Sequence, residues 1–139
     1  MRGLIALTAL VVGLVPAVAL ATTTGATGTT TLKATLSGNV EVPKGSPTGK
    51  GTATITISGS KVCWKFSFSG IDTPLASHIH KAPAGKAGPV VVPFGAAFKA
   101  SGCTTASAGL ATAIAAHPSA YYVNIHTKKY PAGAIRGQL

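Results

Sequence analysis

The chain has 139 residues, which is enough for one domain of ordinary size. It carries 12 Lys plus Arg against 2 Asp plus Glu, so its formal net charge is +10. With 46% hydrophobic and only 10% charged residues, the composition excludes a highly charged disordered chain. The two acids, Glu41 and Asp72, are too few for a carboxylate cage around calcium or magnesium, and a glycosidase would need both of them at one site.

Residues 1–21 have the features of an export signal. Arg2 supplies a positive start, residues 4–15 form a short apolar run, and Ala19-Leu20-Ala21 has the small-x-small pattern of a cleavage site. The run is shorter than the roughly 20 residues of a spanning helix, and a retained anchor is the alternative. We therefore expect a secreted or periplasmic protein with no transmembrane segment after cleavage, which would remove Arg2 and lower the net charge from +10 to +9.

The rest of the chain predicts one domain of short strands. Residues 22–31 contain only Thr, Gly and Ala and are expected to form a flexible leader before a domain at 32–139. Alternating apolar and polar residues and frequent turn signals favour strands, and an Ala-rich segment favours one short helix that Pro118 stops. The expected strands are 32–36, a hairpin over 51–70, 76–80, 90–92, 121–126 and 134–139, and the expected helix is 104–116.

This pattern of elements predicts an all-β sandwich or barrel with one short helix. Cys63 and Cys103 are the only cysteines, and an exported protein reaches an oxidising compartment. We therefore expect a disulfide between them, which would close a loop of about 40 residues and stabilise the fold by about 4 kcal/mol. Two buried free thiols are the alternative.

The histidines are the strongest candidates for a site. His78 and His80 are two residues apart on an expected strand, so both imidazoles point to one face. Alternation in 121–126 sends Tyr122, Asn124 and His126 outward. If these strands are neighbours, the three imidazoles form one cluster on the outer face, with nitrogens within about 4 Å of one another, and three imidazoles suit copper or zinc.

Other interpretations of these residues stay open. The histidines can instead form a structural network with loop carbonyls in the Gly-rich segment after His80, and His117, at the end of the helix, is expected to be structural. Neither a Gly-x-Ser-x-Gly nucleophile motif nor a phosphate-binding loop is present, so no catalytic residue is predicted. The basic residues would attract anionic envelope polymers or lipid head groups, or only solvate the surface; nucleic acid is not an expected partner.

Three motifs resemble the CHRD domain, the module named after chordin. They are His78-Ile79-His80 followed by Gly88-Pro89-Val90-Val91, the segment 121–127, and the closing segment 131–139. The likeness runs over 32–139 and implies an immunoglobulin-like Greek-key β-sandwich, with a suggested similarity to copper/zinc superoxide dismutase and no settled activity. The family usually has Glu after the last-motif glycine; Ala134 stands there in this chain and removes one polar partner of Arg136.

The resemblance to the dismutases extends to the histidines. Those enzymes place two copper ligands as His-x-His and another on a later strand, as His78, His80 and His126 would be, and Arg136 resembles their anion-guiding arginine. The bridging histidine and the zinc-site carboxylate have no counterparts here. We therefore expect a non-catalytic binding or accessory module with a copper site that Tyr122, Asn124 and Arg136 line. A copper-dependent oxidoreductase and a lysine-mediated binder of anionic envelope polymers are the alternatives, and an unknown protein is a further partner class.

Overall fold

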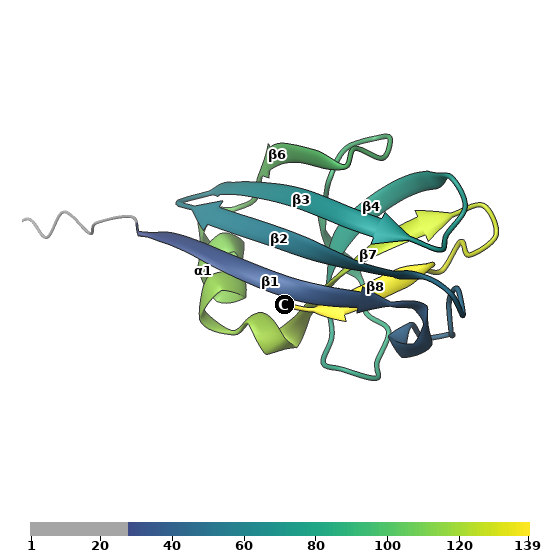
Figure 1. Cartoon of the computed structure of the whole chain (residues 1–139). Helices are drawn as coiled ribbons and strands as arrows, with labels where there is room; N and C mark the ends of the chain where they lie inside the picture. Colours follow the sequence, from purple (N-terminus) through teal and green to yellow (C-terminus); the bar gives the residue numbers. More distant parts are fainter. Residues whose placement is uncertain (1–27) are drawn as a thin grey trace, which may run out of the picture.

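The structure is a computed structural model that describes residues 28–139, so the expectations for the export signal at 1–21 and for the leader up to residue 27 lie outside the described range. Figure 1 shows the course of the chain. The elements are β1 (Thr29–Ser37), η1 (Gly38–Val40), β2 (Lys50–Ser58), β3 (Lys61–Ser69), β4 (Pro74–Lys81), β5 (Val90–Pro93), β6 (Ser101–Thr105), α1 (Ala108–Ala116), η2 (Pro118–Ala120), β7 (Tyr121–Thr127) and β8 (Ile135–Gln138).

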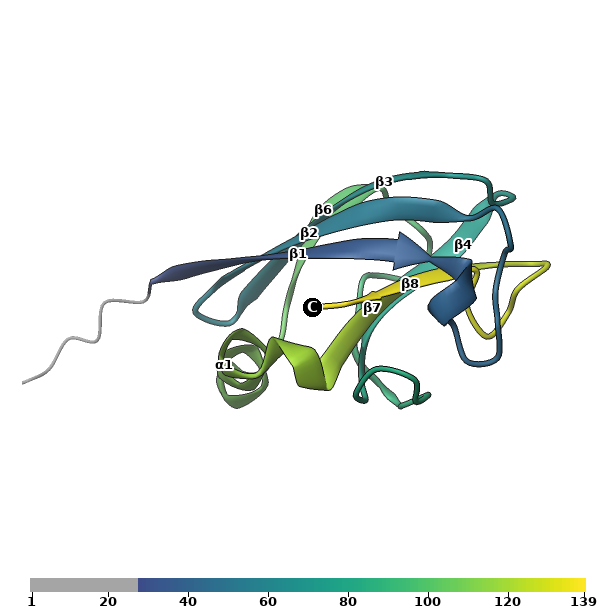
Figure 2. The same cartoon turned by 60° about the horizontal axis from the view of Figure 1, so that its bottom comes forward.

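The strands form one antiparallel sheet in the order β5-β4-β7-β8-β1-β2-β3-β6. In Figures 1 and 2, β1, β2, β3 and β6 make one layer, β4, β7 and β8 lie in the facing layer, and α1 lies at one end. The predicted all-β class with one short helix is confirmed. The two layers of the expected sandwich belong to a single sheet, because β1 pairs with β8 at Ser37 and Arg136.

The core lies between the two layers. In β2 and β3 the apolar side chains that alternate along the sequence point inward and are buried: Ala53, Ile55, Ile57, Val62, Trp64 and Phe66. Complete burial of a side chain such as Ile55 contributes about 1.5–3 kcal/mol. Phe94, just after β5, stacks on Trp64 with ring centroids 4.2 Å apart, so the two layers also meet away from the β1–β8 junction.

The predicted hairpin over 51–70 is confirmed by β2 and β3. Ser58 pairs with Lys61, which leaves Gly59 and Ser60 as a two-residue turn. Gly59 has a φ of 58°, a backbone conformation that favours glycine and that the tight hairpin turns require. The tight turn therefore fixes the register in which the apolar side chains of both strands face the core.

Two boundaries differ from the expectation by three residues or more, and the others by at most two. β1 begins at Thr29, three residues before the expected start at Leu32, because Thr29–Thr31 pair along β2. The helix expected at 104–116 begins only at Ala108, since Ser101–Thr105 forms β6 against β3. None of the helices within residues 28–139 is long and apolar enough to cross a membrane.

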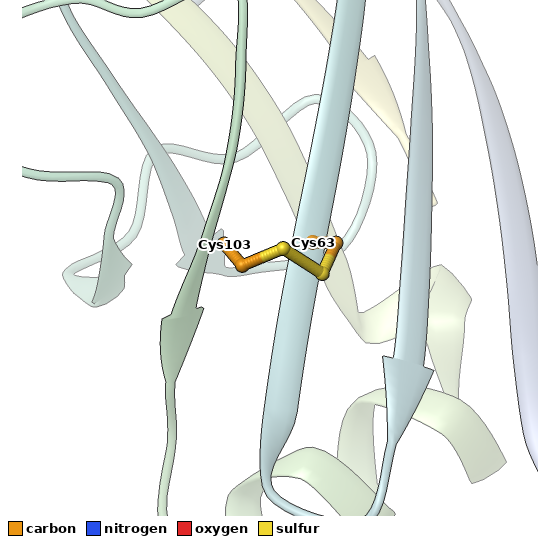
Figure 3. The surroundings of a disulfide bond; sticks show 2 residues. All are labelled: Cys63 and Cys103. Carbon is orange, nitrogen blue, oxygen red and sulfur yellow. A yellow bond between two sulfur atoms is a disulfide. The ribbon is translucent and has the colours of Figure 1, made fainter.

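The predicted disulfide between Cys63 and Cys103 is present. The two residues are directly opposite each other on β3 and β6, with their Cα atoms 4.0 Å apart (Figure 3). The bond therefore holds β6, which is the strand at one edge of the sheet, against its neighbour.

The first turn of α1 depends on a side-chain cap. The Ser107 hydroxyl accepts a hydrogen bond from the backbone N–H of Leu110 at 3.3 Å. We expect Ser107→Ala to lower the free energy of unfolding by about 1 kcal/mol, or roughly 4 °C in Tm, because that N–H loses its partner. Thr112→Ala is the matched control, since Thr112 is exposed on the same helix and caps nothing. Equal Tm values for the two variants in thermal unfolding would refute the capping role.

Candidate metal centre

The structure brings the three predicted histidines together. β4 and β7 are neighbouring antiparallel strands in which His78 is opposite Asn124, His80 is opposite Tyr122, and His126 is opposite Ala76. Because directly paired residues point to the same face, all of these polar side chains project from one side of the sheet. One ring nitrogen from each of His78, His80 and His126 lies within 4.8 Å of the others.

Backbone carbonyls orient two of the three imidazoles. His80 Nδ1 lies 2.9 Å from the Gly88 carbonyl oxygen, and His126 Nδ1 lies 2.9 Å from the Pro131 carbonyl oxygen. A carbonyl only accepts, so each Nδ1 carries a proton and donates it. The structural network with loop carbonyls is therefore real, but it uses one nitrogen of each ring. Metal-binding histidines commonly make this kind of second contact, which fixes the ring orientation.

Two ring nitrogens and the Asn124 amide meet at the centre of the cluster. His126 Nε2 lies 2.8 Å from Asn124 Oδ1 and 3.2 Å from His78 Nδ1. Because the Nδ1 proton of His126 goes to the Pro131 carbonyl, a neutral His126 ring presents the lone pair of Nε2 to this centre. Two nitrogens bound to one copper or zinc ion at about 2.0 Å lie about 3–4 Å apart, so the 3.2 Å between His126 Nε2 and His78 Nδ1 suits a shared ion.

His80 contributes an unpaired nitrogen. Its Nε2 is buried and has no hydrogen-bond partner among residues 28–139, an arrangement that costs about 1–3 kcal/mol unless something binds there. The 4.8 Å limit on the separations in the cluster is wider than the expected 4 Å. An imidazole would therefore have to shift by about 1 Å for all three rings to share one ion.

The cluster keeps imidazoles uncharged. Burial lowers the pKa of His78 to about 4, and the neighbouring charges of His126 and His80 add to the effect. Burial also lowers the pKa of His80, although the Gly88 carbonyl opposes the shift. Neutral imidazoles are the form that binds metal ions, so His78 and His80 are ready to act as ligands at neutral pH.

The candidate site lies beneath loops, whereas the sequence predicted an outward, exposed face. Tyr122 and Asn124 are buried, and the loop between β4 and β5 contacts Tyr122 and Arg136. The Gly88 N–H donates to the Tyr122 hydroxyl at 3.3 Å, and Arg136 Nη1 donates to the Lys86 carbonyl at 2.8 Å. Alternation along a strand shows which residues share a face but not whether a loop covers that face.

Tyr122 separates Arg136 from the imidazoles. The Tyr122 ring stacks on His80 with centroids 4.7 Å apart and an interplanar angle of 7°. The Arg136 guanidinium carbon lies 4.0 Å from the centre of the same ring. Since β7 lies between β4 and β8, Tyr122 stands between the two side chains, and Arg136 supports the cluster through this stack. His117, at the C-terminal cap of α1, is not part of the cluster.

Glu41 belongs to this region, and the sequence analysis did not assign it a role. Its carboxyl group is buried against Gly133, where an added Cβ would lie 2.2 Å from Glu41 Oε1. Burial raises the pKa of Glu41 to about 7, and the Arg136 charge opposes this only in part. Glu41 therefore places an acid near Arg136 in a chain that has Ala134 where the family usually has Glu. The scarcity of acids was the one signal in the sequence that pointed to Glu41.

Comparison with known proteins identifies the family of this chain. Residues 32–139 match the CHRD domain. The chain belongs to the CHRD domain family. The match covers the whole of the sheet from Leu32 onward, including the three histidines and the disulfide. No curated protein and no solved structure matches the chain.

Proposed function

We propose that this CHRD-family protein is an exported, non-catalytic binding module of the cell envelope or secreted space, and that His78, His80 and His126 bind a copper ion. The observation that carries the proposal is the convergence of three imidazoles from β4 and β7, with one ring nitrogen of each within 4.8 Å of the others. A metal ion bound there would give the unpaired Nε2 of His80 a partner.

The chemistry of the donors favours copper. Imidazole nitrogens suit zinc and copper, and at a given nitrogen site copper(II) binds more tightly than zinc. Thiolate is not available, because both cysteines are in the disulfide. The Asn124 side-chain oxygen, 2.8 Å from His126 Nε2, adds a neutral oxygen beside the ion. The donors of this site are therefore neutral, whereas calcium and magnesium prefer carboxylate oxygens.

The disulfide and the N-terminal sequence support export. Disulfides form and persist in oxidising compartments, and the bond between Cys63 and Cys103 joins two paired strands of the domain. Residues 1–21 carry the positive start, apolar run and small-x-small motif of a signal peptide.

Metal titration tests the proposal. We expect the purified protein, stripped of metal by a chelator, to bind one copper(II) ion with a Kd below about 1 µM in isothermal titration calorimetry. His126→Gln should weaken binding about 100-fold or more, because it removes a ligand and the group that positions Asn124.

His117→Gln is the matched control, because His117 lies on α1 outside the cluster. It should leave copper affinity unchanged within about twofold. Failure of both copper and zinc to bind at micromolar concentration would end the metal proposal. Accelerated superoxide decay by the copper-loaded protein would instead make it an oxidoreductase, and we expect no acceleration.

A further inference from the structure

A hollow separate from the histidine cluster lies over β8. It has a volume of about 620 Å³, within the range of small-molecule sites. Val40, Val42 and Pro43 form one wall, Ala84 and Gly85 of the β4–β5 loop form another, and Arg136 lies among the residues of the hollow from β8. Val40 and Val42 are two of the few large apolar side chains that residues 28–139 leave exposed.

Two buried ionisable side chains line this hollow. Arg136 is 2% exposed and Glu41 is 3% exposed, and both line the hollow. Arg136 Nη1 donates to the neutral carbonyl of Lys86, and Glu41 Oε1 is buried with no hydrogen-bond partner. The Arg136 charge acts on Glu41, but the hydrogen bond of the guanidinium goes to a neutral carbonyl, so an anion from outside would add a charged partner that stabilises it.

The remaining chemistry of the hollow points to one class of anion. Because burial raises the pKa of Glu41 to about 7, this side chain holds a proton more readily than an ordinary Glu and offsets less of the Arg136 charge. Lys44 adds a second positive charge to the lining. The walls are valine, proline and alanine, which favour an apolar body over a small hydrated ion such as inorganic phosphate.

We propose that this hollow binds a small organic carboxylate with an apolar body, held by the Arg136 guanidinium at its head and by Val40 and Val42 along its body. Arginine pairs with a carboxylate through two parallel N–H···O bonds. A protonated Glu41 adds a donor to the same head group. The volume suits a body of about six to ten carbon atoms. Copper binding at the histidines is not needed for this site, so the two proposals stand or fall separately.

Octanoate is the probe, and 1-octanol is its uncharged counterpart. We expect octanoate to bind the chelator-treated protein in saturation-transfer NMR and calorimetry at least tenfold more tightly than 1-octanol. Val40→Asp should weaken octanoate binding at least tenfold, because it places a charge on the apolar wall. Val90→Asp is the matched control: Val90 is 46% exposed against 52% for Val40, and it does not line the hollow.

Arg136→Gln removes the charge that selects the head group, so octanoate and 1-octanol should then bind alike. Because Arg136 is buried, circular dichroism must first show that this variant folds; the Val40 and Val90 pair tests the proposal whether or not it does. Absence of octanoate binding at millimolar concentration would overturn the proposal. Equal affinity for the two probes in the unmodified protein, or equal weakening by Val40→Asp and Val90→Asp, would also overturn it.

Discussion

Replacing both Cys63 and Cys103 by Ala should lower the free energy of unfolding by about 4 kcal/mol and the Tm by more than about 10 °C. The disulfide closes a loop with a sequence separation of 40 residues, and its loss restores the conformational freedom of that loop in the unfolded chain. Loss of the bond also frees β6, which pairs only with β3. Urea and thermal unfolding, followed by circular dichroism, measure both quantities.

Reductant provides the control for this experiment. The unmodified protein in reducing buffer should unfold like the double variant, and the double variant should not respond to reductant. If the double variant keeps the stability of the oxidised protein to within about 1 kcal/mol, the loop-closure account of the disulfide is wrong.

Glu41→Gln should gain stability relative to the unmodified protein as the pH rises from about 4.5 to about 7. The pKa of Glu41 is raised from 4.5 to about 7 in the folded protein, so the unfolded chain releases its proton first. Protonated Glu41 therefore stabilises the fold below pH 4.5, and this contribution is lost as the pH approaches 7. The loss is at most about 3 kcal/mol, and Gln, which resembles the protonated acid, does not suffer it.

The difference between variant and unmodified protein isolates this effect. His78 and His80 have lowered pKa values, so they contribute stability that is present above pH 6.5 and is lost as the pH falls. Their effect opposes that of Glu41 and flattens the profile of the unmodified protein. Asp72→Asn, at the other acid, is the matched control, since Asp72 is exposed and should change the profile by less than about 0.5 kcal/mol. Parallel urea-unfolding profiles for Glu41→Gln and the unmodified protein from pH 4.5 to 8 would rule out a protonated, buried Glu41.

Local patterns predicted the strands well where polar and apolar residues alternate. Ala53, Ile55 and Ile57 alternate with threonines, and Gly59 marks the turn, so both the hairpin and its buried face could be read from the sequence. β6 could not, because Ser101–Thr105 has no apolar alternation. The segment becomes a strand through contacts with a distant part of the chain: it pairs with β3, and Cys103 lies opposite Cys63.

The site divides in the same way. Alternation within two strands placed His78, His80 and His126 on one face, once β4 and β7 were taken as neighbours. Glu41 and the covering loop could not be placed, because neither belongs to a periodic segment. Their positions depend on long-range contacts such as that of Arg136 with Lys86, fifty residues away in the sequence.

The pairing of Ser37 with Arg136, where β1 meets β8, lets a ligand in the hollow affect how firmly the two halves of the sheet are joined. Thr35 on β1 and Gln138 on β8 both line it, so an occupant touches both halves of the sheet across their seam. Such an occupant would stabilise the pairing of β1 with β8. Hydrogen–deuterium exchange of the amides along this seam should slow when octanoate binds, while exchange in the β2–β3 hairpin stays the same.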